Sequence, residues 1–227
     1  MIKIPDNEQA YEYENAFYLT SKPGRLGKLL AHYELYTMSL DIPGVMVECG
    51  IFKGASFSRF AMMRSLLEHQ ETRKIVGFDI FGKFPQTNFE DDKNKLDLFI
   101  EQAGDESISQ EQLIQSLQDK DCHKNIELIA GDICETAPQY IQDNPELKIS
   151  LLNLDVDIYE PNVAILDNLF PKISIGGVLI LDDYGIFPGA TKAIDDYFKH
   201  RPEKVHKLPF AHSPSYIIKE KELKKTF

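Results

Sequence analysis

The alternation of short apolar runs with segments of helical periodicity constrains this fold more than any other feature of the sequence. Five runs are short and apolar enough to be buried strands, and they lie at 45–49, 74–79, 126–130, 149–154 and 177–181. Helices are expected around them, at 24–40, 56–68, 133–142, 160–170 and 189–200. This order is typical of an α/β domain, in which helices cover both faces of a mostly parallel sheet.

The remaining segments complete a single domain over residues 1–227. Two late runs, at 204–208 and 215–219, are interrupted by prolines, which predicts a closing hairpin at one sheet edge and about seven strands in all. Residues 1–43 are expected to form an N-terminal helical extension, and 80–120 an insert. The polar start of the insert, 80–95, lacks periodicity, which favours a lid over the site in preference to a merely mobile loop.

Charge and composition exclude several classes of protein. The net charge is −11, and the only basic cluster, at 219–225, also holds Glu220 and Glu222, so we expect a solvated tail and no nucleic-acid partner. The N-terminus lacks a signal-peptide-like stretch and no run of 18 apolar residues occurs, which predicts a soluble, cytoplasmic protein without a membrane segment. The three cysteines form no C-x-x-C pair, so no disulfide framework is expected.

A turn with two glycines joins the first strand to its helix. Glycine at Gly50 and Gly54 lets the backbone approach a ligand closely. A dinucleotide site would need a third glycine where this chain has Phe52, so the pyrophosphate fingerprint is absent. The acid Glu48 suits a ligand with an amine and a sulfonium instead. We expect contacts to such a cofactor from Glu48, Gly50, Phe52, Gly54 and Ser56, the alternative being a turn that serves only tight packing.

Two more acids end the second and third strands. Asp79 is placed to bind both ribose hydroxyls of a nucleoside that lies across the strand ends. Asp132 follows the third strand in the same way and is expected near the adenine. The alternative for Asp79 is a helix cap or a solvated loop. Together with Glu48, these acids predict one shared nucleoside ligand.

Four aspartates follow the fourth and fifth strands. If these strands are neighbours, the carboxylates of Asp155, Asp157, Asp182 and Asp183 converge, and a cation is needed to offset their repulsion. Oxygen ligands suit Mg²⁺, with Mn²⁺ as a substitute. Strand alternation would turn Asp157 to the opposite face, so we expect the ligands to be Asp155, Asp182 and Asp183, with a turn that rotates Asp183 back. The alternative for the Asp182 and Asp183 pair is the capping of a helix or turn.

In five ordered blocks the chain resembles the macrocin O-methyltransferase family. The blocks are KLLAHYELY at 28–36, VECGIFKGASF at 47–57, VGFDIFGKFP at 76–85, LDVDIYEP at 154–161 and GGVLILDDYG at 176–185. The resemblance implies a class I methyltransferase fold, Rossmann-like, with a seven-stranded sheet whose last strand is antiparallel. It also implies S-adenosylmethionine as cofactor and Mg²⁺ on Asp155, Asp182 and Asp183. The chain departs from the family at Val156 and Ala55, where glycine is common, and neither change removes a ligand.

These observations predict an S-adenosylmethionine-dependent, Mg²⁺-dependent O-methyltransferase that acts on a sugar hydroxyl of a nucleotide sugar or glycosylated small molecule. Asp155 is the expected proton acceptor besides being a ligand, because no histidine follows a strand; His32 is expected to be an ordinary histidine. The alternatives are a catechol-type methyltransferase, a nicotinamide-dependent oxidoreductase, and a module that binds without catalysis. The helix at 24–40 is expected either to cover the cofactor or to form a homodimer contact.

Overall fold

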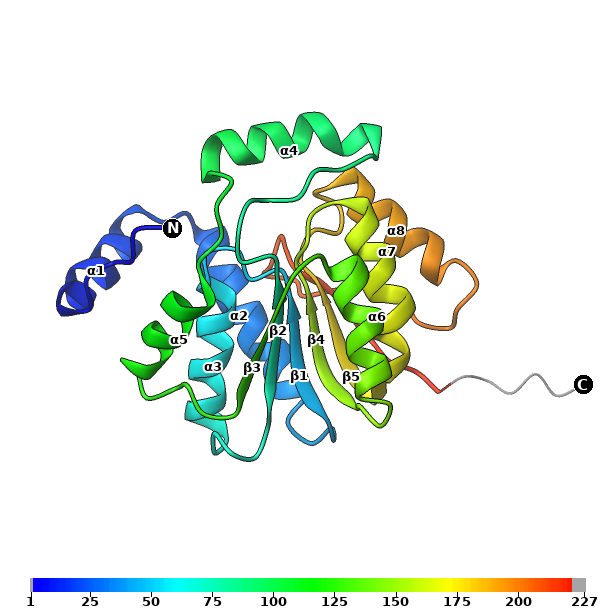
Figure 1. The fold of residues 1–227 in the computed structure, drawn as a ribbon, viewed down its shortest axis with the longest axis horizontal. Helices are drawn as coiled ribbons and strands as arrows, with labels where there is room; N and C mark the ends of the chain where they lie inside the picture. The colour runs from blue at the N-terminus through cyan, green and yellow to red at the C-terminus, as the bar shows by residue number, and fades with distance from the viewer. Residues whose placement is uncertain (1, 222–227) are drawn as a thin grey trace, which may run out of the picture.

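The computed structural model describes residues 2–221 and contains one seven-stranded sheet with the strand order β3-β2-β1-β4-β5-β7-β6 (Figure 1). Five strands are parallel: β1 (Val45–Cys49), β2 (Ile75–Asp79), β3 (Ile126–Ala130), β4 (Ile149–Leu154) and β5 (Ile173–Leu181). The predicted hairpin is confirmed, since β7 (Ser215–Ile218) pairs antiparallel with both β5 and the short β6 (His206–Lys207). Strand order reverses at β1, which pairs with β2 on one side and β4 on the other.

Helices cover both faces of the sheet, as the strand composition requires. One face packs against α6 (Ile133–Asp143), α7 (Tyr159–Asn168) and α8 (Pro188–Phe198). The other packs against α2 (Pro23–Met38), α3 (Ala55–Leu67) and α5 (Gln110–Gln118). Parallel strands buried on both sides are continuous apolar runs, and β4 is accordingly buried at every position. Short 3₁₀ turns occur at Asn7–Gln9 and Phe170–Lys172.

The N-terminal extension contains two helices. The predicted helix at 24–40 is α2, and it is preceded by α1 (Ala10–Thr20), none of whose residues is buried. Figure 1 shows α1 extending away from the sheet. No helix in the described range is both long and apolar enough to cross a membrane.

The insert at 80–120 differs from the structureless polar stretch expected at its start. Residues 90–103 form the helix α4 (Glu90–Ala103), which begins with three acidic residues and ends at Gly104, whose φ is +81°. Only Asp92 and Leu96 of this helix are buried. Its first six residues are polar, and its apolar residues follow at helical spacing only in the second half, at Leu96, Phe99, Ile100 and Ala103, beyond the stretch 80–95 that lacks periodicity. α4 lies above the carboxyl ends of the strands, whereas α5 packs into the core through Leu113 and Leu117 (Figure 1).

Candidate active site

A cavity of about 520 Å³ opens at the carboxyl ends of β1, β2, β4 and β5, beneath the loop 80–87 and α4. One wall consists of the turn after β1 with Asp79, Gly131 and Asp132. The opposite wall consists of residues 155–158 with Asp182 and Asp183. This is the point where the strand order reverses, and open α/β sheets bind ligands in the crevice there. The cavity is large enough for a small-molecule site.

The turn after β1 requires glycine at Gly50. Its φ is +89°, and a Cβ at this position would lie 1.7 Å from the carbonyl oxygen of Asp155. Glycine therefore lets the ends of β1 and β4 come together. Gly54, with φ +82°, begins α3 and does not line the cavity, since a Cβ there would face Leu113.

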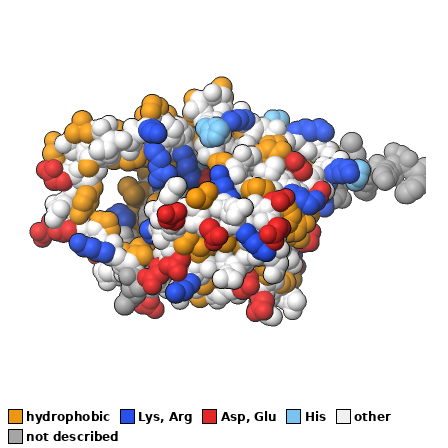
Figure 2. Space-filling model, turned by 90° about the horizontal axis from the view of Figure 1, so that it is seen from above, with side chains coloured by type: hydrophobic (Ala, Val, Ile, Leu, Met, Phe, Trp, Pro, Cys, Tyr) orange, Lys and Arg blue, Asp and Glu red, His pale blue; other side chains and the backbone are white. Residues whose placement is uncertain are grey.

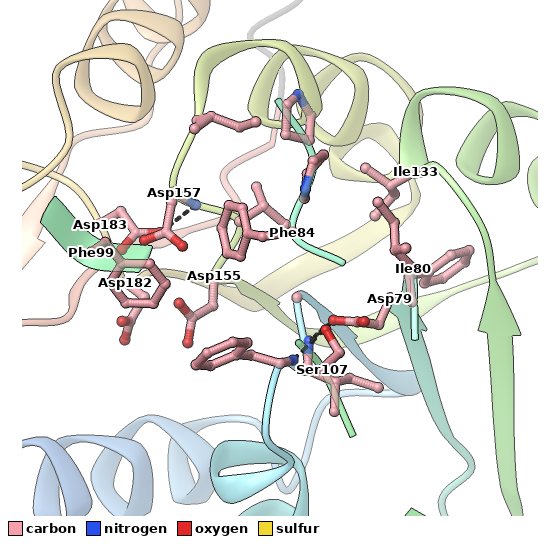
Figure 3. A pocket seen from close by; sticks show the side chains of 18 of the residues that line it. Asp79, Ile80, Phe84, Phe99, Ser107, Ile133, Asp155, Asp157, Asp182 and Asp183 are labelled. Atoms are coloured by element: carbon pink, nitrogen blue, oxygen red, sulfur yellow. Dashed lines mark hydrogen bonds between the residues drawn. The ribbon is translucent and has the colours of Figure 1, made fainter. Parts of the chain in front are cut away.

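The carboxylate of Asp79 holds this turn in shape. Its Oδ2 accepts hydrogen bonds from the backbone N–H groups of Ile51 at 2.8 Å and Phe52 at 2.9 Å. Its Oδ1 accepts a third from Phe81 N at 2.6 Å. Asp79 also lines the cavity (Figure 3), so a ligand there can reach it, and its contact with ribose hydroxyls stays a prediction. Its part in holding the turn could not be read from the sequence.

Glu48 lies beneath the floor of the cavity and is fully buried. Its Oε1 accepts a hydrogen bond from Ser56 Oγ at 2.5 Å, while its Oε2 has no partner. Burial raises the pKa of Glu48 to about 8, and the bond from Ser56 opposes that shift. Because Ser56 lines the cavity and Glu48 does not, Glu48 can reach a ligand only through Ser56 or water.

Asp132 caps α6, because its Oδ1 accepts a hydrogen bond from Cys134 N at 2.9 Å. It lines the cavity together with Ile133 and Ile80, whose apolar side chains stand at the same end (Figure 3). The predicted strand-end acids are thus brought to one cavity, with Glu48 just beneath it.

Asp155, Asp157 and Asp183 form a carboxylate cluster. Each offers an oxygen, and these oxygens lie within 4.8 Å of one another. Asp183 Oδ2 also accepts a hydrogen bond from Asp157 N at 2.9 Å. Burial and mutual repulsion raise the pKa of Asp155 and Asp183 well above the ordinary value and that of Asp157 to about 7. Buried carboxylates this close fit a hard divalent cation such as Mg²⁺, whose charge would relieve the repulsion.

The cluster differs from the expected ligand set in one member. Asp157 faces Asp155 because β4 ends at Leu154 and Asp157 has φ +60°, so strand alternation does not continue to it. Asp182 and Asp183, in contrast, face opposite sides as strand alternation predicts: Asp183 contacts Asp157, and the expected rotation of Asp183 toward Asp182 is not seen. Asp182 instead points to α2, although all four carboxyl groups stand at the same end of the cavity (Figure 3).

Two residues of α2, Lys28 and His32, lie beside Asp182. Lys28 Nζ donates to Asp182 Oδ2 at 2.6 Å and lies 3.9 Å from Asp155 Oδ2. His32 Nε2 lies 3.7 Å from Asp182 Oδ1. Burial disfavours ionisation of Asp182, but His32 and Lys28 outweigh it and lower the pKa of Asp182 to about 2. His32 is therefore a fully buried site residue, contrary to expectation.

The sequence offers one indication that Lys28 and His32 act together, which is their spacing of four residues. Residues four apart share one helix face, but the sequence does not show which strand that face meets. His32 is further fixed by Arg59 Nη1 at 2.9 Å from its Nδ1, and its ring stacks on Phe60. Lys28 thus lies at the cavity wall, and whether this helix covers a cofactor or forms a homodimer contact stays a prediction.

Aromatic side chains from distant segments roof the cavity. Phe99 of α4 lies with its ring centroid 5.6 Å from both Phe52 and Phe84, and 6.3 Å from Phe187. All four rings line the cavity. The insert therefore covers the site through packed apolar side chains and not merely through a polar loop.

The sheet order, the cavity at its reversal point and the acidic strand ends define a class I, Rossmann-like methyltransferase fold. Solved structures share it. The calicheamicin methyltransferase CalS11 is 27% identical, covers 94% of this chain and 86% of its own, and has a TM-score of 0.72. The O-methyltransferase NovP is 20% identical, covers 86% and 80%, and has a TM-score of 0.73.

The chain belongs to the macrocin O-methyltransferase (TylF) family, which matches residues 24–208 and confirms the resemblance. Demethyldecarbamoylnovobiocin O-methyltransferase of Streptomyces niveus is 26% identical over 69% of this chain and 59% of its own length. A tetracenomycin 4'-O-methyltransferase, of Streptomyces olivaceus and acting on a rhamnosyl derivative by its name, is 28% identical over 69% and 58%. The chain thus spans under two thirds of the length of these relatives.

Replacing Gly50 by alanine tests the close approach of β1 and β4. We expect Gly50→Ala to lower the free energy of unfolding by more than about 2 kcal/mol, because a Cβ meets the Asp155 carbonyl and the backbone is left-handed. Chemical denaturation measures this. Gly24→Ala is the control, since nothing lies within 4 Å of a Cβ there; equal stability of the two variants would contradict the assignment.

Proposed function

We propose that the protein is an S-adenosylmethionine-dependent, Mg²⁺-dependent O-methyltransferase that methylates a sugar hydroxyl. The observation that carries this proposal is that one cavity holds both the turn after β1 and the carboxylate cluster. A methyl donor on the turn would then face an acceptor held at the carboxylates. Family membership supports the reaction class, and the names of the relatives support a sugar acceptor.

The donor's nucleoside is assigned to the wall formed by the turn, Asp79 and Asp132. Each oxygen of a carboxylate accepts more than one hydrogen bond, so Asp79 can bind ribose hydroxyls while it holds the turn. Ile80 and Ile133 offer apolar surface for the base beside Asp132. The amine end is assigned to Ser56, with Glu48 beneath it.

Mg²⁺ would be held by Asp155 and Asp183, which belong to both the expected and the observed sets, with Asp157 or Asp182 completing the ligands. When bound, it orients vicinal hydroxyls and lowers the pKa of the one that reacts. Asp155 is the proposed proton acceptor because its backbone packs against Gly50, which places it at the boundary between the two walls. The aromatic roof excludes water from the charged reactants.

The exposed Arg25 in the cavity lining favours an anionic acceptor, and a nucleotide sugar is therefore preferred to an uncharged glycoside. Arg25, Lys28 and Arg59 line the α2 and α3 side in a chain whose net charge is −11. Lys28 is paired with Asp182 and Arg59 with His32, whereas Arg25 is exposed. Figure 2 shows several Lys and Arg side chains gathered on the face seen from above.

Ligand-dependent stability tests the cofactor. We expect S-adenosylhomocysteine to raise the thermal midpoint, because saturation at a hundred times Kd contributes about 2.7 kcal/mol to stability. The melting is recorded with S-adenosylhomocysteine, NAD⁺ or no ligand, each with Mg²⁺ or EDTA. A rise with NAD⁺ alone would favour an oxidoreductase. Binding without methyl transfer to any sugar or catechol would favour a non-catalytic module.

Metal affinity tests the carboxylates without requiring turnover. Calorimetric titration with Mn²⁺ should show that Asp155→Asn and Asp183→Asn each weaken binding by at least about tenfold, since each removes a charged oxygen ligand. Asp167→Asn, at an exposed position of α7, is the control. Comparing the Mn²⁺ affinities of Asp157→Asn and Asp182→Asn identifies the third carboxylate ligand. If Asp182→Asn loses more affinity, Asp182 leaves Lys28 to bind the metal. If Mn²⁺ binding is unchanged in all four of these variants, the carboxylates do not form a metal site.

Removal of the positive charge at Arg25 tests whether the acceptor is anionic. We expect Arg25→Ala to raise KM for nucleoside-diphosphate sugars by about fivefold to tenfold, because a charge-assisted contact to phosphate is lost. KM for an uncharged glycoside should not change. Lys22→Ala is the matched control, as this exposed lysine lies just before α2 and does not line the cavity. Equal effects on both acceptors would count against an anionic substrate.

A further inference from the structure

One fully buried carboxylate outside the cluster, that of Asp92, lies where three helices begin. Asp92 is in the first turn of α4. Its Oδ2 accepts a hydrogen bond from the N–H of Tyr159, the first residue of α7, at 2.9 Å. Its Oδ1 accepts one from the N–H of Gly189, in the first turn of α8, at 2.7 Å. Figure 1 shows the start of α4 above these two helices.

Neither α7 nor α8 has a side-chain cap of its own. Their N-cap residues are Ile158 and Phe187, which cannot accept a hydrogen bond through the side chain. The first N–H groups of a helix need an acceptor, and an anion is favoured there because of the helix dipole. Asp92 therefore supplies, from another helix, the cap that both lack.

The contact is closely packed on the side of α8. A Cβ on Gly189 would lie 1.9 Å from Asp92 Oδ2, so alanine at this position is incompatible with the carboxylate in its place. The φ of Gly189 is not in the left-handed region, so the backbone itself would tolerate alanine. The glycine is thus required by its close neighbours and not by its own backbone: besides the carboxylate, the Cβ of Tyr159 in α7 would lie 2.8 Å from a Cβ on Gly189.

A second carboxylate fixes the segment just before α4. Glu160 of α7 accepts hydrogen bonds from Thr87 Oγ1 at 2.9 Å and Asn88 N at 2.8 Å. The beginning of α4 is thereby tied to α7, while its far part carries Phe99 and Ala103 into the cavity lining. The loops that lead into α7 and α8 also line the cavity and carry the cluster aspartates.

We propose that Asp92 is a positioning residue that latches the cover, residues 80–104, to the N-termini of α7 and α8. It keeps Phe84 and Phe99 over the cavity and holds the loops after β4 and β5 in register with the cover. The inference goes beyond the proposed function and rests on it only in the choice of an adenosyl ligand as a probe.

Hydrogen exchange of the full chain without ligand, read by mass spectrometry, tests the latch. Asp92→Asn loses one of the two bonds, Asp92→Ala loses both, and Gly189→Ala disrupts the contact from the other side. We expect amides in 84–104 to exchange about tenfold faster in Asp92→Ala and Gly189→Ala, with a smaller rise in Asp92→Asn and no change in β1 and β4. Asp91→Asn, exposed in the same turn, is the control for charge.

The affinity for S-adenosylhomocysteine, measured by calorimetry, supplies the second readout. We expect the affinity to fall by about tenfold in Asp92→Ala and by less in Asp92→Asn, in the same order in which the exchange rates rise. Exchange in the cover equal to that of Asp91→Asn would overturn the proposal. So would a rise spread equally over cover and strands, because Asp92 would then contribute only to global stability. If the unaltered protein does not bind the ligand, the proposed function fails, and the exchange comparison still decides the latch.

Discussion

The structure depends on the contact between Gly50 and the backbone of Asp155. At the reversal of strand order, β1 and β4 approach so closely that a side chain at residue 50 would overlap the carbonyl of Asp155. This contact joins the turn that faces the proposed donor to the loop that carries the first two aspartates. Backbone packing thereby places the two walls of the cavity side by side.

Electrostatics then determines how the carboxylates are shared. Three of them face one another and have raised pKa values, because burial and mutual repulsion disfavour their ionised forms; a nearby positive charge would offset both effects. The fourth, Asp182, already has that charge from Lys28. Because Lys28 also lies 3.9 Å from Asp155, the N-terminal extension is part of the charge balance of the site.

The sequence predicted the sheet, its hairpin edge and the acids at the strand ends, because buried parallel strands leave short apolar runs whose last residues meet at one edge. It did not predict which aspartates face each other, since Asp157 turns through a positive φ that no pattern encodes. It missed His32 and Lys28 because their importance depends on which strand α2 crosses. It missed α4 because that helix begins with six polar residues and has no side-chain cap of its own, while Asp92 contacts the starts of two other helices.

The shallow attachment of α4 separates the lining of the cavity from the stability of the sheet. Of its fourteen residues only Asp92 and Leu96 are buried, and the strands beneath make their own core without it. Side chains such as Phe99 and Ala103 that face the cavity can therefore change without repacking the sheet. The aromatic roof is in this sense an exchangeable part of the molecule: its side chains can vary while the turn after β1 and the carboxylates beneath stay the same.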